Sequence, residues 1–271
     1  MLKKSIIVIL FVMLFCSFAF VVNAEELKPI TLTWTSGGEG GTWGTQAAGI
    51  AELINQKEPK ITIKVVPGGG MLNPARVGSG DVPIGFGLGI SDSLAFKGEE
   101  PYEQKYPDLR TMGGPIGVYN LHFIAAKELG VTTVEEVIGM IKGGKSLKIA
   151  TTTPGASDYM LFKQVLSFYG LSFEDIEDAG GKIFKASYSD MANLYKDRHV
   201  DFTFTNCTPP VAHAMESNVS RPVSFLAFSR EITEWLHKTL GLLPPDSELS
   251  RIPGGFYQGV DEDIIYSPAT P

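Results

Sequence analysis

A strand that ends in a run of glycines and leads directly into a helix is the feature that most constrains this chain. Residues 30–43 read ITLTWTSGGEGGTW, so an alternating apolar run ends in four glycines, and a helix-period segment follows over residues 45–55. Glycines permit positive φ and leave room beside the main chain, and a helix start adds unpaired N–H donors at the positive end of a dipole. The loop suits a small molecule with a carboxylate, although a tight turn that binds nothing would read the same.

Two further segments repeat this arrangement. A β-branched strand is expected over residues 61–66 and ends in PGGG, after which we expect Asn73 to cap a short helix that Pro74 begins. A third strand is expected over residues 82–88, with GISDS at 89–93 as its exit loop. The alternation of strands and helices indicates parallel sheets, whose carboxyl edge is where open α/β sheets bind ligands.

The second half of the chain uses the same design. A looser region at residues 96–115 precedes a strand over 119–126, and we place the first crossing between two domains there. A strand over 147–153 ends in PGASD, and an amphipathic helix then runs to Gly170. The other expected elements are strands over 183–186 and 200–205, helices over 133–142 (with a capping box at Thr133), 190–198 and 230–240, and a return through 222–228.

The strand expected to end at residue 205 leads into the turn NCTPP, where we expect Thr208 to cap the next helix and Pro209 to begin it. Two domains whose strand-end loops face one another form a hinged clamshell around a small ligand. The sequence therefore predicts an α/β, two-lobed binding protein.

The N-terminus has the pattern of a cleaved signal peptide. Lys3 and Lys4 precede an apolar run over residues 6–22, and Val22-Asn23-Ala24 supplies the small residues of a cleavage site before Glu25. Cys16 lies in the apolar run without the small residue that a lipoprotein site needs before its cysteine. We expect residues 1–24 to be removed, which gives a periplasmic or extracytoplasmic protein.

Net charge and cysteine content limit the classes of binding partner and the possible disulfides. Without Lys3 and Lys4, 21 of the 23 basic residues remain against 30 acidic ones, a net charge of −9. No basic run is present, which argues against nucleic acid and anionic membrane surfaces as partners, and we expect a monomer. Cys207 alone remains after cleavage, so no internal disulfide is possible.

Five motifs, in order and spacing, carry a resemblance to a known family: TSGGEGGTWG at 35–44, GGGMLNPARVGSGD at 68–81, IGFGLGISDS at 84–93, TPGASD at 153–158, and KDRHVDF at 196–202 followed by NCTPP. The chain resembles the substrate-binding receptors of tripartite ATP-independent periplasmic (TRAP) transporters, specifically the TAXI branch. The resemblance covers about residues 30–257 and implies a type II periplasmic-binding-protein clamshell. It implies capture of a small acid, such as glutamate, and its delivery to a membrane permease driven by an ion gradient.

The resemblance and the loop pattern together predict the ligand-binding residues. They are Gly37, Gly38, Gly41, Thr42, Trp43, Asn73 and Ser91 from the first lobe, Tyr119 near the crossing, and Pro154, Gly155, Ser157, Asn206, Cys207 and Thr208 from the second. Two residues depart from the family: Trp43 stands where relatives usually have tyrosine, and Glu39 where a small hydroxyl residue is common. The change could select a ligand with an amine or a larger apolar part, or Glu39 could simply point to solvent.

The resemblance also implies a division of the chain. We expect lobe 1 over residues 25–122, lobe 2 over 123–220, and a return to lobe 1 over 221–271. The family pattern normally continues with another helical segment, so the C-terminal part is expected to be short, and lobe 1 could expose apolar surface there.

We expect neither an enzyme nor a cofactor or metal site. The four histidines lack metal-ligand spacing, and Ser157 lacks the G-x-S-x-G elbow. Residues 139–146 match the P-loop pattern, but a helix precedes them and a strand follows, the reverse of a phosphate cradle. Three functions stay open: a transport receptor, a sensory receptor that signals to a membrane kinase, and a secreted enzyme that uses Cys207 or Ser157.

Overall fold

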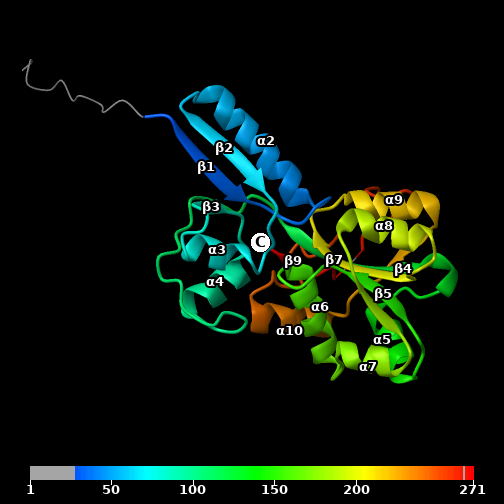
Figure 1. The fold of residues 1–271 in the computed structure, drawn as a ribbon. Coiled ribbons are helices and arrows are strands. Elements are labelled where there is room, and N and C mark those ends of the chain that lie inside the picture. The colour runs from blue at the N-terminus through cyan, green and yellow to red at the C-terminus, as the bar shows by residue number, and fades with distance from the viewer. Residues whose placement is uncertain (1–27, 265) are drawn as a thin grey trace, which may run out of the picture.

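The computed structural model describes residues 28–264 and 266–271, so the expected signal peptide (residues 1–24) lies outside the described residues. Within these residues no helix combines the length and the apolar character needed to span a membrane. The chain forms two α/β lobes, each built on its own sheet (Figure 1).

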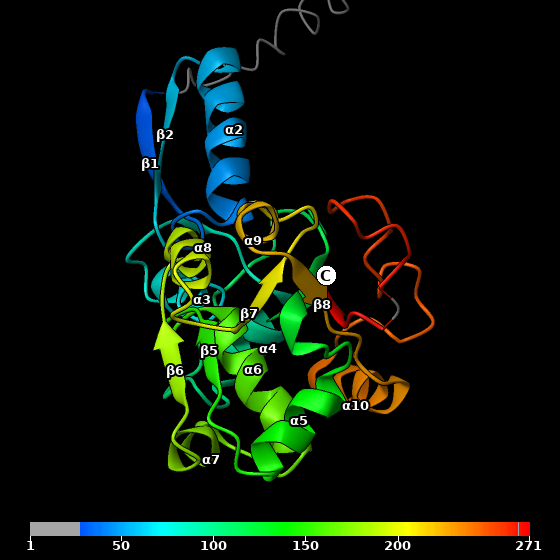
Figure 2. The same ribbon diagram turned by 90° about the vertical axis from the view of Figure 1, so that its right-hand side faces the viewer.

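The smaller lobe has a parallel three-stranded sheet in the order β2-β1-β3. Its elements are β1 (Ile30–Thr35), α2 (Thr42–Lys57), β2 (Ile61–Val66), α3 (Asn73–Gly78), β3 (Ile84–Gly85) and α4 (Gly89–Lys97). Alternate residues of β1 and β2, among them Trp34 and Ile63, pack with Ala47 and Ala51 of α2 in one apolar cluster. Figure 2 shows α2 running beside β1 and β2, away from the larger lobe.

The larger lobe has a mixed sheet in the order β6-β5-β7-β4-β8, with β9 also paired to β4. Its strands are β4 (Tyr119–Ala126), β5 (Lys148–Thr151), β6 (Lys182–Lys185), β7 (Phe202–Cys207), β8 (Val223–Phe225) and β9 (Ala269–Thr270). Its helices are η1 (Lys127–Leu129), α5 (Val134–Lys142), α6 (Ser157–Phe168), α7 (Phe173–Asp178), α8 (Tyr188–Lys196), α9 (Ala212–Ser220) and α10 (Arg230–Leu240). Parallel pairing is confirmed for β5 with β6 and β7, but β4 is antiparallel to its neighbours, contrary to expectation.

Helices cover both faces of the larger sheet. Leu121 and Phe123 of β4 point into a cluster with residues of α5, α6, α7 and α10, where Phe162 stacks on Phe204 with ring centroids 4.7 Å apart. Ile124 and Ala126 point the other way, into a cluster with α8 and α9. Because β4 is buried on both faces, apolar residues stand at consecutive positions from Phe123 to Ala126, while the buried polar side chains of Asn120 and His122 are hydrogen-bonded.

The C-terminal segment takes a different place from the one expected. Residues 221–271 do not return to the smaller sheet: β8 and β9 pair with β4, and α10 packs in the larger lobe's core through Ile232 and Leu236. All of β4 also lies in the larger sheet, so the boundary expected at residue 122 falls within a strand. The reason is that β4 is fully buried, and the edge it does not share with β7 needs partners for its backbone groups.

Two expected caps are also wrong. Leu72 is the N-cap of α3, and the Asn73 side chain is instead buried among three loops. Helix α9 begins at Ala212, and the Thr208 hydroxyl donates to the Val118 carbonyl oxygen at 2.9 Å. The capping box of Thr133 is confirmed. Residues 139–142 form the end of α5 and β5 follows residue 146, the helix-then-strand order expected for a segment that is no phosphate loop.

Candidate ligand-binding site

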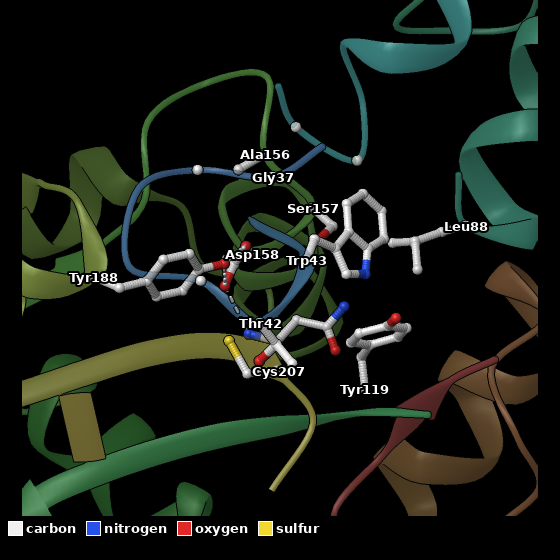
Figure 3. A pocket seen from close by; sticks show the side chains of 15 residues that line it. Gly37, Thr42, Trp43, Leu88, Tyr119, Ala156, Ser157, Asp158, Tyr188 and Cys207 are labelled. Atoms are coloured by element: carbon white, nitrogen blue, oxygen red, sulfur yellow. Dashed lines mark hydrogen bonds between the residues drawn. The ribbon is translucent and has the colours of Figure 1, made fainter. Parts of the chain in front are cut away.

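A cavity lies between the two lobes and contains about 400 Å³ of space not filled by atoms, its mouth included (Figure 3). Both lobes contribute to its wall through strand-end loops and helix starts. The lining residues are Gly37, Gly38, Gly41, Thr42, Trp43, Gly69, Gly70 and Leu88 from the smaller lobe and Tyr119, Ala156, Ser157, Asp158, Tyr188, Asn206 and Cys207 from the larger one.

The smaller lobe presents the N-terminus of α2. Gly41 is the N-cap, with no side chain capping the first turn, and Thr42 and Trp43 are the first two helical residues. The Trp43 ring packs edge-on to Tyr119 with centroids 5.6 Å apart. Its Nε1 is buried and lacks a hydrogen-bond partner of normal geometry in the described structure. This wall therefore offers N–H donors beside an aromatic surface.

The larger lobe presents the N-terminus of α6, where Ser157 and Asp158 are the first two helical residues. The Asp158 carboxylate is buried, and its Oδ1 accepts a hydrogen bond from the Asn206 N–H at 2.7 Å. The Tyr188 hydroxyl donates to the same carboxylate and lies 3.1 Å from each oxygen (Figure 3).

Burial dominates the electrostatics of this wall. It raises the pKa of Asp158 to about 6, although hydrogen bonds from Asn206 and Tyr188 favour the charged form. Burial and the neighbouring Asp158 raise the pKa of the Cys207 thiol well above its ordinary value, so the thiol stays protonated. Burial also raises the pKa of Tyr119. None of the lining residues is a lysine, arginine or histidine.

The lobes touch directly around the cavity. The Gly155 carbonyl oxygen accepts hydrogen bonds from the N–H groups of Met71 at 3.0 Å and Leu72 at 3.1 Å. The ring of Tyr188 lies so close to Gly41 that a Cβ there would be 2.7 Å from Cε2 of the ring. The clamshell is therefore closed in this structure.

Nine of the fourteen residues predicted to bind ligand line the cavity: Gly37, Gly38, Gly41, Thr42, Trp43, Tyr119, Ser157, Asn206 and Cys207. Pro154 and Gly155 lie in the turn just before the lining residues Ala156 to Asp158, and Gly155 contacts the other lobe. Thr208 comes directly after the lining residue Cys207, and its hydroxyl donates a hydrogen bond to the Val118 carbonyl oxygen.

Asn73 and Ser91 are buried behind the cavity wall rather than in it. Asn73 Oδ1 accepts from Thr35 Oγ1 and the Gly69 N–H, while its Nδ2 donates to three carbonyl oxygens. The Ser91 hydroxyl donates to the Leu88 carbonyl oxygen. Both side chains hold loops that line the cavity, so their polar groups are already used.

Six lining residues are absent from the predicted set: Gly69, Gly70, Leu88, Ala156, Asp158 and Tyr188. All but Tyr188 lie in or beside the loops that the sequence singled out, and the PGASD motif contains Asp158 itself. Tyr188 begins α8, well away from those motifs in sequence, and no sequence pattern marks it.

The other candidate features lie outside the cavity. Glu39 is exposed and is not among the lining residues, in agreement with a side chain that points to solvent. His122 and His213 are buried in the larger lobe, and burial lowers their pKa values to about 4 and about 3. The described residues contain no cluster of acidic, histidine or cysteine side chains that could hold a metal ion.

Solved structures share this fold at low sequence identity. MatC from Rhodopseudomonas palustris with bound malate has a TM-score of 0.53 and 13% identity, over 73% of this chain and 67% of that one. A protein from Bordetella bronchiseptica RB50 has a TM-score of 0.51 and 16% identity, over 74% and 57%. The alkanesulfonate-binding protein SsuA from Xanthomonas axonopodis pv. citri, bound to MOPS, has a TM-score of 0.44 and 16% identity, over 74% and 61%.

This chain thus spans about three fifths of the length of SsuA. No curated protein sequence matches it significantly. The fold is the two-lobed α/β architecture of periplasmic binding proteins, as expected from the sequence. The profile of the NMT1-like family matches residues 35–265, which include parts of both lobes and every residue that lines the cavity, and the chain is therefore a member of the NMT1-like family.

Proposed function

We propose that this protein is an extracytoplasmic solute-binding receptor that captures a small carboxylate or amino acid between its lobes. One observation carries the proposal: the N-termini of α2 and α6, from different lobes, meet at one cavity whose lining has no cationic side chain. A negative group at a helix N-terminus gains about 0.3–1 kcal/mol, and more when partly buried. Backbone amides therefore supply the recognition that lysine or arginine supplies elsewhere.

The tryptophan of the α2 turn adds a directed donor. The Nε1 of Trp43 is buried in the cavity wall near the Tyr119 hydroxyl but makes no hydrogen bond of normal geometry, and an unmet hydrogen bond in a buried site is costly. An acceptor oxygen of the ligand would satisfy this group, while the Trp43 and Tyr119 rings would cover the ligand's apolar part. A small organic acid has both features.

The absence of catalytic chemistry in this design supports a binding role. The Cys207 thiol is held protonated by burial and by Asp158, and no histidine lines the cavity to serve as a base. Ser157 is an ordinary first helical residue rather than part of a nucleophile elbow. We infer that the protein acts by closing on a ligand and not by turning it over.

We assign the receptor to the TAXI branch of TRAP transport systems, on the motifs that resemble that branch. Malate in MatC, which has the same fold, agrees with a small acid as ligand. In this proposal residues 1–24 direct export, the mature monomer closes on a ligand such as glutamate, and a membrane permease takes up the ligand from the closed form.

Thermal shift with a library of carboxylates and amino acids tests the proposal on the mature chain, residues 25–271. A ligand that binds only the native state at 100 times its Kd stabilises by about 2.7 kcal/mol. Neutral amides of the same acids serve as controls and should give no shift. A folded protein that no acid stabilises would refute the receptor assignment.

Two matched variants locate the binding. Trp43→Phe keeps a ring but removes the N–H, and a hydrogen bond to a charged group contributes about 1.5–3 kcal/mol, so affinity should fall roughly ten- to hundredfold. Trp34→Phe changes another tryptophan of the same core whose Nε1 is also buried without a partner but which does not line the cavity. That variant should keep wild-type affinity.

A further inference from the structure

The two walls of the cavity differ in hydrogen-bonding character. The smaller lobe offers donors, namely the first-turn N–H groups of α2 and the Trp43 Nε1, which makes no hydrogen bond of normal geometry. The larger lobe adds two side-chain acceptors, the Asp158 carboxylate and the Asn206 Oδ1. A ligand that satisfies both walls must itself carry unlike groups at its two ends.

Asp158 creates this difference. Its carboxylate lies in the first turn of α6, so it already compensates the positive end of that helix. Its Oδ1 also accepts a hydrogen bond from the Asn206 N–H at 2.7 Å, so this donor is already used. The larger lobe therefore holds an anion of its own where a second anionic group of a ligand would have to bind.

The charge of Asp158 is left without a cationic partner. No ion pair of the described residues includes it, and the groups that hydrogen-bond to it are all neutral: the Tyr188 and Thr152 hydroxyls and the backbone amides of Asn206 and Asp158. A carboxylate buried to this degree is normally neutralised by a cation or a proton.

Asn206 adds a second unmet acceptor on the same wall. Its Nδ2 donates to Thr270 Oγ1 at 3.1 Å, while its Oδ1 is buried and has no partner in the described structure. The Asn206 N–H donates to Asp158, and both residues line the cavity. Their two acceptor groups, the Asp158 carboxylate and the Asn206 Oδ1, therefore belong to one patch. Buried acceptors are normally hydrogen-bonded, so a hydrogen-bond donor on the ligand would complete this patch.

We propose that Asp158 sets the charge specificity of the receptor: the cavity selects ligands with one carboxylate toward α2 and an N–H-bearing cationic group toward Asp158 and Asn206, and it rejects dianions. The inference rests on the proposed function, since it concerns the ligand of the same cavity. It names Asp158 as the residue that separates amino carboxylates from dicarboxylates of equal length.

Matched probes of equal chain length test the specificity by calorimetry at pH 8, where Asp158 is ionised. Each set contains an amino carboxylate, a monocarboxylate and a dicarboxylate, for example 4-aminobutyrate, butyrate and succinate, and sets of two to six carbons are compared together with the α-amino acids. Amino carboxylates should bind at least tenfold more tightly than the dicarboxylates of the same length.

Asp158→Asn removes the charge and keeps the shape. It should weaken amino carboxylates at least tenfold and strengthen dicarboxylates at least tenfold, which reverses the order. Tyr188→Phe removes the phenol that donates to Asp158 but leaves the charge, and should keep the wild-type order. Asp92→Asn removes a half-buried carboxylate outside the cavity and should leave all affinities unchanged.

The outcomes separate the two proposals. Wild-type protein that binds dicarboxylates as well as amino carboxylates overturns the inference and leaves the receptor function standing. Folded protein that binds no probe at all overturns the receptor function as well. If Asp158→Asn does not fold, the order of the wild-type and Tyr188→Phe affinities still decides the inference.

Discussion

The carbonyl oxygen of Gly155 accepts a hydrogen bond from the N–H of Met71 at 3.0 Å, and these residues belong to different lobes. The same oxygen also accepts from Leu72. Gly155 has a φ of +101°, a backbone conformation that favours glycine, which lets its carbonyl point across the cleft. Direct backbone contacts of this kind hold the lobes together around the cavity, and four predictions follow from the structure of this region.

Gly69→Ala should weaken ligand binding by opening the clamshell. A Cβ on Gly69 would lie 2.6 Å from the Gly155 oxygen, which is backbone and cannot rotate away. We expect a loss of about tenfold in affinity, equal to about 1.4 kcal/mol, with the unliganded lobes still folded. Gly89→Ala is the control, because a Cβ there meets no atom within 4 Å. Equal affinities of the two variants, measured by calorimetry, would show that the contact does not matter for closure.

Gly41→Ala should lower ligand affinity, whereas Gly44→Ala should raise the stability of the fold, although both residues lie at the start of α2. A Cβ on Gly41 would lie 2.7 Å from Cε2 of Tyr188, so the ring must leave its place in the cavity wall and affinity should fall. A Cβ on Gly44 meets nothing within 4 Å, and alanine in a helix is favoured over glycine by about 0.5–1 kcal/mol. Thermal melting and calorimetry measure both effects; a Gly41→Ala protein with full affinity would contradict the expectation.

Asn73→Ala should destabilise the smaller lobe without removing a ligand contact. The side chain joins the ends of β1 and β3 to the glycine loop through hydrogen bonds to Thr35, Ser36, Phe86 and Gly69. Each buried group left without its partner costs about 1–3 kcal/mol, so urea unfolding should show a loss of several kcal/mol. Asn193→Ala, on the exposed side of α8, should cost less than about 0.5 kcal/mol. A small effect at Asn73 would mean that water replaces the network.

Asp158→Asn should change how stability depends on pH. The folded-state pKa of about 6 lies above the ordinary value of 3.8, so the folded protein binds more protons than the unfolded chain between these values. The contribution of Asp158 to stability therefore falls as pH rises from about 4 to 6. Relative to wild type, the variant should gain on the order of 3 kcal/mol between pH 4 and pH 7.

The measurement is urea unfolding of both proteins across that pH range. His122 and His213 act oppositely: burial lowers their pKa values, so their contribution to stability grows as pH rises toward 6.5. Both histidines are present in wild type and variant, and the difference between the two proteins isolates Asp158. A difference that stays constant with pH would show that Asp158 titrates normally.

Local sequence determined the elements and most of the cavity loops. The strands over residues 61–66 and 119–126 and the helix over 230–240 have the predicted bounds, because branched apolar runs and helix periodicity act over a few neighbouring residues. The loops after β1 and β5 and the end of β7 were predicted to reach the ligand cavity, because glycines and prolines after strands mark where chains turn at a sheet edge.

Only the tertiary structure decided how distant parts meet. The antiparallel place of β4 and the pairing of β8 and β9 with it depend on burial of the whole strand, and not on a motif in those segments. Tyr188 reaches the cavity only because α8 packs on β5 and β7 and the lobes close, and this places its hydroxyl on Asp158 and its ring on Gly41. Closure brings together residues that are neighbours only in space. The short-range sequence pattern that predicted the glycine loops therefore cannot predict these contacts.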